Sequence, residues 1–180
     1  MLMAGAGSYQ GVDSSLRMIE MAKQNLAGTP GRVELTDIED VIPPPRSLDL
    51  VTARLSLHYV PALDRIMNAA AQGLAADGRF IFTVVHPVIT SYDNQPTRPR
   101  TSWTVDDYFH PGPRMRNWLG SKVTWYHRTI EDYVNAVTEA GLTLTALREC
   151  QPEPARFDGH TEELARRQRV PLFLLLNARV

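Results

Sequence analysis

Two aspartates follow predicted strands directly, at positions where a carboxylate can bind a ligand. Asp13 comes after the short strand predicted over residues 8–12, and Asp37 ends the alternating run RVELTD. Ligands of open parallel sheets bind beyond the carboxyl ends of the strands. At that edge Asp13 could accept hydrogen bonds from both hydroxyls of a ribose, and Asp37 could meet an adenine amino group. The alternative is structural: Asp13 caps the following helix, and Asp37 only terminates its strand.

Two histidines are candidate general bases. His86 follows the predicted strand 79–85 and precedes Pro87, and His127 precedes a predicted helix within the run WYHRT. Histidine titrates near neutral pH, so either ring could take a proton from a hydroxyl, an amine or an acidic carbon. In the alternative, each ring donates a hydrogen bond to a backbone carbonyl and is structural only.

Five further residues are candidates for binding cofactor or substrate. His58 and Tyr59 follow the predicted strand 48–53 and are candidates for the floor of a substrate pocket. Arg54 could contact cofactor or substrate, or it could be a buried ion-pair partner. Trp118 and Tyr126 are the predicted pocket members of an aromatic segment, where such rings line an apolar pocket or stabilise a sulfonium. The alternative is that they only pack this segment onto the body.

The elements that position these residues alternate between strand and helix. This alternation is typical of an α/β fold with a mainly parallel sheet. The continuous apolar character of residues 48–53 predicts a strand buried on both faces. Helices are predicted where apolar residues recur at helical spacing between capping and stop signals. The predicted strands are 8–12, 32–37, 48–53, 79–85, 142–150 and 171–180, and the predicted helices begin after Ser14, at Pro61, at Thr129 and near Glu162.

The segment 87–126 breaks this alternation. It holds all three tryptophans of the chain and shows no clear period. Because it is long for a plain connection, it is predicted to be a lid or substrate-covering insertion. The rest of the 180 residues is predicted to form one domain with it.

Composition excludes several classes of protein. The formal net charge is −1, and no basic stripe indicates nucleic acid. One cysteine, Cys150, allows neither an internal disulfide nor a cysteine-based zinc site, so we expect no metal and a reducing, cytoplasmic environment. No signal peptide or membrane-spanning run is evident, and no membrane association is expected.

Four segments in order resemble class I S-adenosylmethionine-dependent methyltransferases. They are GVDSSLRMIEMAK, ELTDIED, LDLVTARLSLHYV and LAADGRFIFTVVHPVIT. The later stretch WTVDDYFHPGPRMRNWLGSKVTWYHRT is similar to a bacterial small-molecule branch of that family. The resemblance implies a Rossmann-like fold whose last strand is antiparallel, with S-adenosylmethionine as cofactor and a small molecule as methyl acceptor.

The resemblance also implies roles for individual residues. Asp13 and Asp37 would bind the nucleoside of the cofactor, and the residues after the strand 48–53 would line its methionine part. His86 and His127 would face the acceptor. The implied cofactor-binding set is Asp13, Ser14, Met18, Asp37, Ile38, Arg54 and Leu55, and the implied substrate-binding set is His58, Tyr59, Trp118 and Tyr126.

The chain departs from the family at its front. Members carry a first strand and a glycine-rich loop before the ribose-binding acid, whereas MLMAGAGS resembles the helix after that loop. An absent central strand would leave two buried edges with unpaired amide and carbonyl groups. We therefore expect a closed gap, marginal stability, a misassigned start, or a partner: a second copy or another strand-supplying chain.

Two functions follow. The first is methyl transfer to a small molecule, in which the protein supplies proximity, alignment and a base. The alternative is a methyltransferase-like protein that does not methylate: a ligand-binding or partner subunit, or a cyclase or isomerase, because one fold hosts many chemistries.

Overall fold

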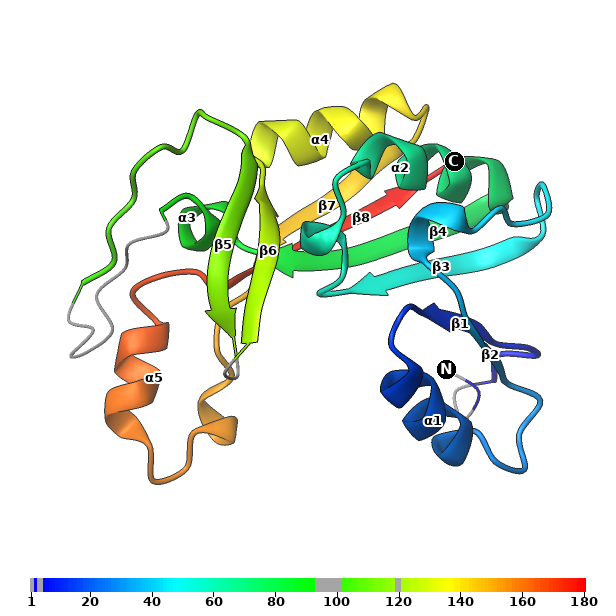
Figure 1. Cartoon of the computed structure of the whole chain (residues 1–180), viewed down its shortest axis with the longest axis horizontal. Coiled ribbons are helices and arrows are strands. Elements are labelled where there is room, and N and C mark those ends of the chain that lie inside the picture. The colour runs from blue at the N-terminus through cyan, green and yellow to red at the C-terminus, as the bar shows by residue number, and fades with distance from the viewer. Residues whose placement is uncertain (1, 3–4, 93–101, 119–120) are drawn as a thin grey trace. The chain divides into compact units, whose positions relative to one another are not determined.

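A computed structural model describes residue 2 and residues 5–92, 102–118 and 121–180, without the side chain of Trp118. The chain forms two compact units, Met1–Ile42 and Pro43–Val180 (Figure 1). The prediction of one domain with a lid over 87–126 stays a prediction, and residues 93–101 and 119–120 of that segment lie outside the described part of the chain.

The first unit is a strand–helix–strand motif. Strand β1 (Gln10–Asp13) pairs in parallel with β2 (Arg32–Leu35), and α1 (Leu16–Asn25) connects them. Ser15 is the N-cap of α1 and accepts a hydrogen bond from the Met18 amide. The prediction of Ser14 as cap is therefore wrong by one residue, because Asp13 takes the Ser15 amide and turns the chain there. The 3-10 helix η2 (Ile38–Asp40) follows β2.

The second unit contains a four-stranded sheet in the order β3-β4-β8-β7. Strands β3 (Leu48–Arg54) and β4 (Leu74–Val85) are parallel, whereas β8 (Phe173–Arg179) is antiparallel to both β4 and β7 (Thr143–Glu149). The predicted α/β fold with an antiparallel last strand is confirmed, and the sheet of this unit is mixed, with one parallel and two antiparallel strand pairs. In the described part of the chain, the parallel pairs β1–β2 and β3–β4 belong to separate sheets.

Strand β3 corrects one prediction. It was expected to be buried on both faces, but Ala53 is its only buried residue, and Leu50 is 42% exposed. The reason is its place at the edge of the sheet, where only β4 pairs with it. The core lies instead around β4 and β8, which contribute Phe80, Phe82, Leu174 and Leu176.

Two helices cover one face of this sheet (Figure 1). Helix α2 (Leu63–Gly73) and helix α4 (Ile130–Glu139) contact each other, and they contact β4 and β7 respectively. The predicted capping box of α4 is confirmed: Thr129 accepts from the Asp132 amide, and Asp132 accepts from the Thr129 amide. Pro61 was predicted to begin α2. This prediction is wrong, because the N-cap of the helix is Ala62 and Pro61 stands before it.

The remaining elements lie in the connections that follow β3, follow β4 and precede β8. The 3-10 helix η3 (Leu57–Tyr59) follows β3, and the short helix α3 (Pro87–Thr90) follows β4. An antiparallel hairpin, β5 (Gly112–Trp118) and β6 (Ser121–His127), fills much of the predicted insertion. The 3-10 helix η4 (Pro154–Arg156) and the predicted C-terminal helix, α5 (Thr161–Arg167), precede β8. No helix among the described residues is long and apolar enough to cross a membrane.

Candidate functional site

Asp13 ends strand β1, as predicted, whereas Asp37 does not end β2 but is the N-cap of η2, two residues beyond that strand. Asp13 is the last residue of β1 and is paired in register with Leu35, the last residue of β2, and Asp37 follows two positions later. One carboxylate oxygen of each is used locally: Asp13 Oδ1 accepts from the Ser15 amide at 2.8 Å, and Asp37 Oδ1 accepts from the Glu39 amide at 3.0 Å. In the described part of the chain, neither Oδ2 atom has a hydrogen-bond partner.

Exposed apolar side chains accompany Asp13. Met18 is 50% exposed on α1, and Leu35 is 51% exposed opposite Asp13 on β2. Side chains of paired residues stand on the same face of a sheet, so Leu35 and Asp13 share a face. A carboxylate beside apolar surface suits a ribose joined to a flat base. Leu35 was not predicted, although its alternation with Val33 could have indicated this face. Ser14 is exposed and Ile38 is half-buried.

The other two predicted cofactor residues lie in the second unit. Arg54 is the last residue of β3, and Leu55 follows it directly. Arg54 is exposed. Leu55 has a φ of 53°, in the left-handed region that residues other than glycine rarely adopt. Its amide donates to the backbone oxygen of Thr83 at 2.8 Å and lies 3.2 Å from that residue's hydroxyl. This unforeseen strain at the carboxyl end of a strand is typical of functional sites.

The strain at Leu55 can be measured by two substitutions. Leu55→Gly should be more stable than Leu55→Ala by about 1 kcal/mol, because glycine alone adopts a positive φ without steric cost. At ordinary positions the order is reversed. Denaturant unfolding of both variants decides the matter, and an alanine variant more stable than the glycine variant would show that Leu55 is not strained in solution.

The two candidate bases are fully buried and hydrogen-bonded. The Val88 amide donates to His86 Nδ1 at 3.2 Å, which leaves the proton on Nε2, and Nε2 donates to Glu149 at 3.0 Å. His127 Nε2 donates to the Tyr108 carbonyl at 2.9 Å, so its Nδ1 accepts from the Thr90 hydroxyl at 2.7 Å. A base role therefore requires that either ring exchange a present partner for the acceptor.

Burial lowers the pKa of both rings. For His86 the effect of burial exceeds the opposing effect of Glu149. For His127 burial outweighs the hydrogen bond to the Tyr108 carbonyl, and the charges of Arg114 and Arg116 lower the pKa further while Asp132 raises it. Both rings are thus neutral near pH 7, which is the protonation state that a base needs. The assignment of either as the base stays a prediction.

Two of the four predicted substrate residues, His58 and Tyr59, contact each other on η3, beside β6. His58 is 1% exposed, its ring centroid lies 4.4 Å from that of Tyr59, and Trp125 meets it edge-on at 5.4 Å. Tyr126 lies beneath the guanidinium of Arg128 at 5.9 Å. Burial, and secondarily Arg128, lowers the pKa of His58 to about 4. The side chain of Trp118 lies outside the described part of the structure.

Arginines hold the predicted insertion in place, and sequence reasoning missed them. Arg114 donates to the carbonyls of Ser91, Asp107 and His110, and Arg116 donates to the carbonyl of Ile89 at 2.8 Å. These bonds join β5 to the end of α3, where helical carbonyls lack partners within the helix. The alternation of arginines in RMRNW is the signal that could have indicated both a strand and its anchored face.

A groove between α2 and α4 lies apart from these candidates. Its lining includes the carboxylates of Asp64, Asp132 and Glu139, and it includes none of the predicted site residues. No group of three potential metal ligands occurs among the described residues.

Comparisons with known proteins identify the family. A family model described as a methyltransferase domain matches residues 1–82. A crystal structure of an S-adenosylmethionine-dependent methyltransferase from Mesorhizobium loti is 30% identical, with a TM-score of 0.88 over 99% of this chain and 83% of its own. A Listeria monocytogenes structure assigned to the same enzymes is 31% identical, with a TM-score of 0.85 over 99% of this chain and 82% of its own. The chain belongs to the S-adenosylmethionine-dependent methyltransferases.

This membership confirms the predicted family and its Rossmann-like fold. A third relative, a Haemophilus influenzae protein described as uncharacterized, is 26% identical over 157 residues, or 81% of this chain. The methyltransferase chain spans 62% of that relative's length. The family uses S-adenosylmethionine, and a carboxylate that shares a sheet face with an exposed apolar side chain, as Asp13 does with Leu35, is compatible with its nucleoside.

Proposed function

We propose that this protein transfers a methyl group from S-adenosylmethionine to a small-molecule acceptor. The observation that carries the proposal is the pair of aspartates at the carboxyl end of β1 and just beyond that of β2, each with one oxygen held by a local amide and the other without a partner in the described residues. A carboxylate fixed in this way is oriented before the ligand arrives, which lowers the entropic cost of binding.

Each predicted residue would have a defined task. Asp13, with Ser14 and Met18, would bind the ribose and the adjoining part of the base, and Asp37, with Ile38, would bind the adenine. Arg54 and the strained Leu55 would contact the methionine part. The cofactor supplies an electrophilic methyl group, so the chain's own residues need only align the acceptor, exclude water and accept a proton.

The proton acceptor is proposed to be His86 or His127. Both rings are neutral near pH 7 and both belong to the segments that adjoin the hairpin. His127 is bonded through Nδ1 to a hydroxyl that also lies 3.3 Å from the Pro87 carbonyl, so Thr90 can reorient when the ring takes a proton. Partners of this chain, a second copy or a strand-supplying protein, would add a strand to the edge of β3.

Titration with S-adenosylhomocysteine tests the proposed function. We expect saturable binding by the 180-residue chain, weakened about 10–100-fold by Asp13→Ala, because charge-assisted hydrogen bonds contribute about 1.5–3 kcal/mol each. Glu20→Ala is the matched control, since Glu20 is an exposed acid on α1. Calorimetry measures both affinities.

A folded chain that does not bind S-adenosylhomocysteine would contradict cofactor-dependent methylation. Equal weakening by both substitutions would show a general effect of charge and remove Asp13 from the site. Product analysis with and without S-adenosylmethionine then separates methyl transfer from a cyclase or isomerase reaction on the same fold.

A further inference from the structure

Two buried nitrogen atoms near η3 have no hydrogen-bond partner in the described structure. One is Nδ1 of His58, a side chain only 1% exposed. The other is Nη1 of Arg128, the residue that directly follows β6. Buried polar atoms in native proteins are almost always hydrogen-bonded, so two exceptions in one place call for an explanation.

Arg128 is fixed by its second terminal nitrogen. Nη2 donates to the carbonyls of Val60 and Pro61, both at 2.7 Å, and the charge of Arg128 lies close enough to the Tyr133 hydroxyl to act on its pKa. These partners are neutral, and none of them is a carboxylate. Among the described residues Arg128 forms no ion pair, and the two carbonyls set the orientation of its guanidinium. A guanidinium held in this way suits a planar anion.

His58 and Arg128 occupy the same locality. Val60 and Pro61, which Arg128 binds, stand two and three residues after His58, and the charge of Arg128 acts directly on the His58 ring. Because burial and this charge both oppose protonation, His58 remains neutral and can donate from one ring nitrogen. A neutral donor beside a fixed cation recognises an anion without adding a second charge.

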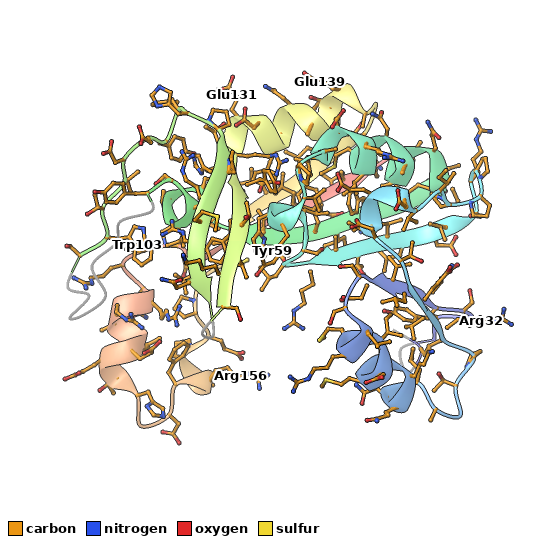
Figure 2. All side chains as sticks on the ribbon, in the orientation of Figure 1. Arg32, Tyr59, Trp103, Glu131, Glu139 and Arg156 are labelled. Carbon is orange, nitrogen blue, oxygen red and sulfur yellow. The ribbon has the colours of Figure 1, made fainter. Side chains whose placement is uncertain are left out.

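Aromatic rings lie against both His58 and Arg128. Trp125 lies edge-on to His58 at 88°, and Tyr59 lies over it with an interplanar angle of 37°. Tyr59 is 40% exposed and is the part of the cluster that faces solvent, on η3 beside the hairpin (Figure 2). Tyr126 lies against Arg128. Aromatic rings beside buried polar atoms are groups that commonly line small-molecule sites.

We propose that His58 Nδ1 and Arg128 Nη1 bind the carboxylate of the methyl acceptor, which is a small aromatic or similarly flat acid, and that the Tyr59 ring covers it. The inference rests on the proposed function where it takes the bound acid to be the methyl acceptor. The site itself consists only of residues in the Pro43–Val180 unit. His58 would be a specificity-determining residue for that acid.

Benzoate and its neutral isostere benzamide are the probes that test this site. In protein labelled with ¹⁵N at histidine and arginine, we expect benzoate to shift the His58 Nδ1 and Arg128 side-chain resonances with saturation. Benzamide should bind at least about tenfold more weakly, because it lacks the charge that Arg128 recognises. Equal affinities for the two probes, or no binding of benzoate at millimolar concentration, would overturn the proposal.

Paired variants separate recognition from packing. His58→Phe keeps a flat buried ring but removes Nδ1, and should lose most benzoate binding. His58→Asn keeps an N–H donor at the δ position and should restore it in part. Arg114→Lys is the control, because Arg114 bonds only backbone carbonyls elsewhere on the insertion. Unchanged binding in His58→Phe would overturn the proposal.

Failure here is distinguishable from failure of the proposed function. A chain that binds S-adenosylhomocysteine but not benzoate would retain the methyltransferase proposal and lose the acid-binding site. A chain that binds benzoate at His58 but not S-adenosylhomocysteine would retain the site and lose the cofactor-dependent reaction.

Discussion

Replacement of Tyr133 by alanine is expected to lower the free energy of unfolding by about 3–5 kcal/mol. Tyr133 is 2% exposed on α4, and its ring lies 6.4 Å from that of Phe82 in the core of the sheet. Burial raises the pKa of its hydroxyl to about 12, so the hydroxyl stays protonated. The substitution therefore removes a large ring from a packed core and also removes a hydroxyl that lies near the charge of Arg128.

Tyr133→Phe separates these two contributions. The ring remains and only the hydroxyl is lost, so the cost should fall to about 0.5–1.5 kcal/mol. Phe109→Ala is the control, because Phe109 is 81% exposed and its loss should change stability by less than about 0.5 kcal/mol. Denaturant unfolding monitored by circular dichroism gives all three values. A phenylalanine variant as unstable as the alanine variant would mean that the hydroxyl, and not packing, dominates.

The Tyr133 variants also bear on the acid-binding proposal. Arg128 donates to the carbonyls of Val60 and Pro61, and its charge acts on the Tyr133 hydroxyl, so Tyr133 lies beside the guanidinium whose Nη1 atom is proposed to bind the carboxylate. Tyr133→Phe should therefore weaken benzoate binding without removing any atom of the proposed site. The same residue supports the packing of α4 on the sheet and lies beside the candidate ligand group.

Local signals in the sequence were sufficient for most of the fold. The capping box at Thr129 and Asp132 spans three residues, so it could be predicted without tertiary information. The strand-end position of Asp13 was likewise local. The burial of β3 could not be predicted from its composition, because an apolar run does not reveal whether a strand is central or at an edge.

Long-range partners explain what the sequence did not predict. Glu149 meets His86 across 63 positions, and Arg128 meets Val60 across 68, and neither pair has a sequence signature. The β5–β6 hairpin was missed because its alternate positions carry arginines, which read as polar although their guanidiniums are held by main-chain carbonyls of α3 and the following residues. The left-handed backbone at Leu55 also has no signal, because glycine or asparagine is the usual residue there.

Acidification from pH 7 is expected to destabilise the protein through its buried histidines. The pKa of His58 is lowered from 6.5 to about 4 in the folded chain, and those of His86 and His127 are also lowered. Below pH 6.5 the unfolded chain takes up protons that the folded chain does not, so stability falls as pH falls. For His58 the loss grows as the pH falls from 6.5, is complete below pH 4 and amounts to about 3 kcal/mol.

The pH dependence of two variants assigns this loss to His58. His58→Phe should lose less stability between pH 6.5 and pH 4 than the wild type, since one proton-linked group is gone. His160→Asn should keep the wild-type dependence, because His160 is exposed before α5. Urea unfolding at several pH values measures both curves. If His58→Phe kept the full wild-type slope, the ring would be protonated equally in the folded and unfolded chains. In that case it would not be the neutral donor that the acid-binding site requires.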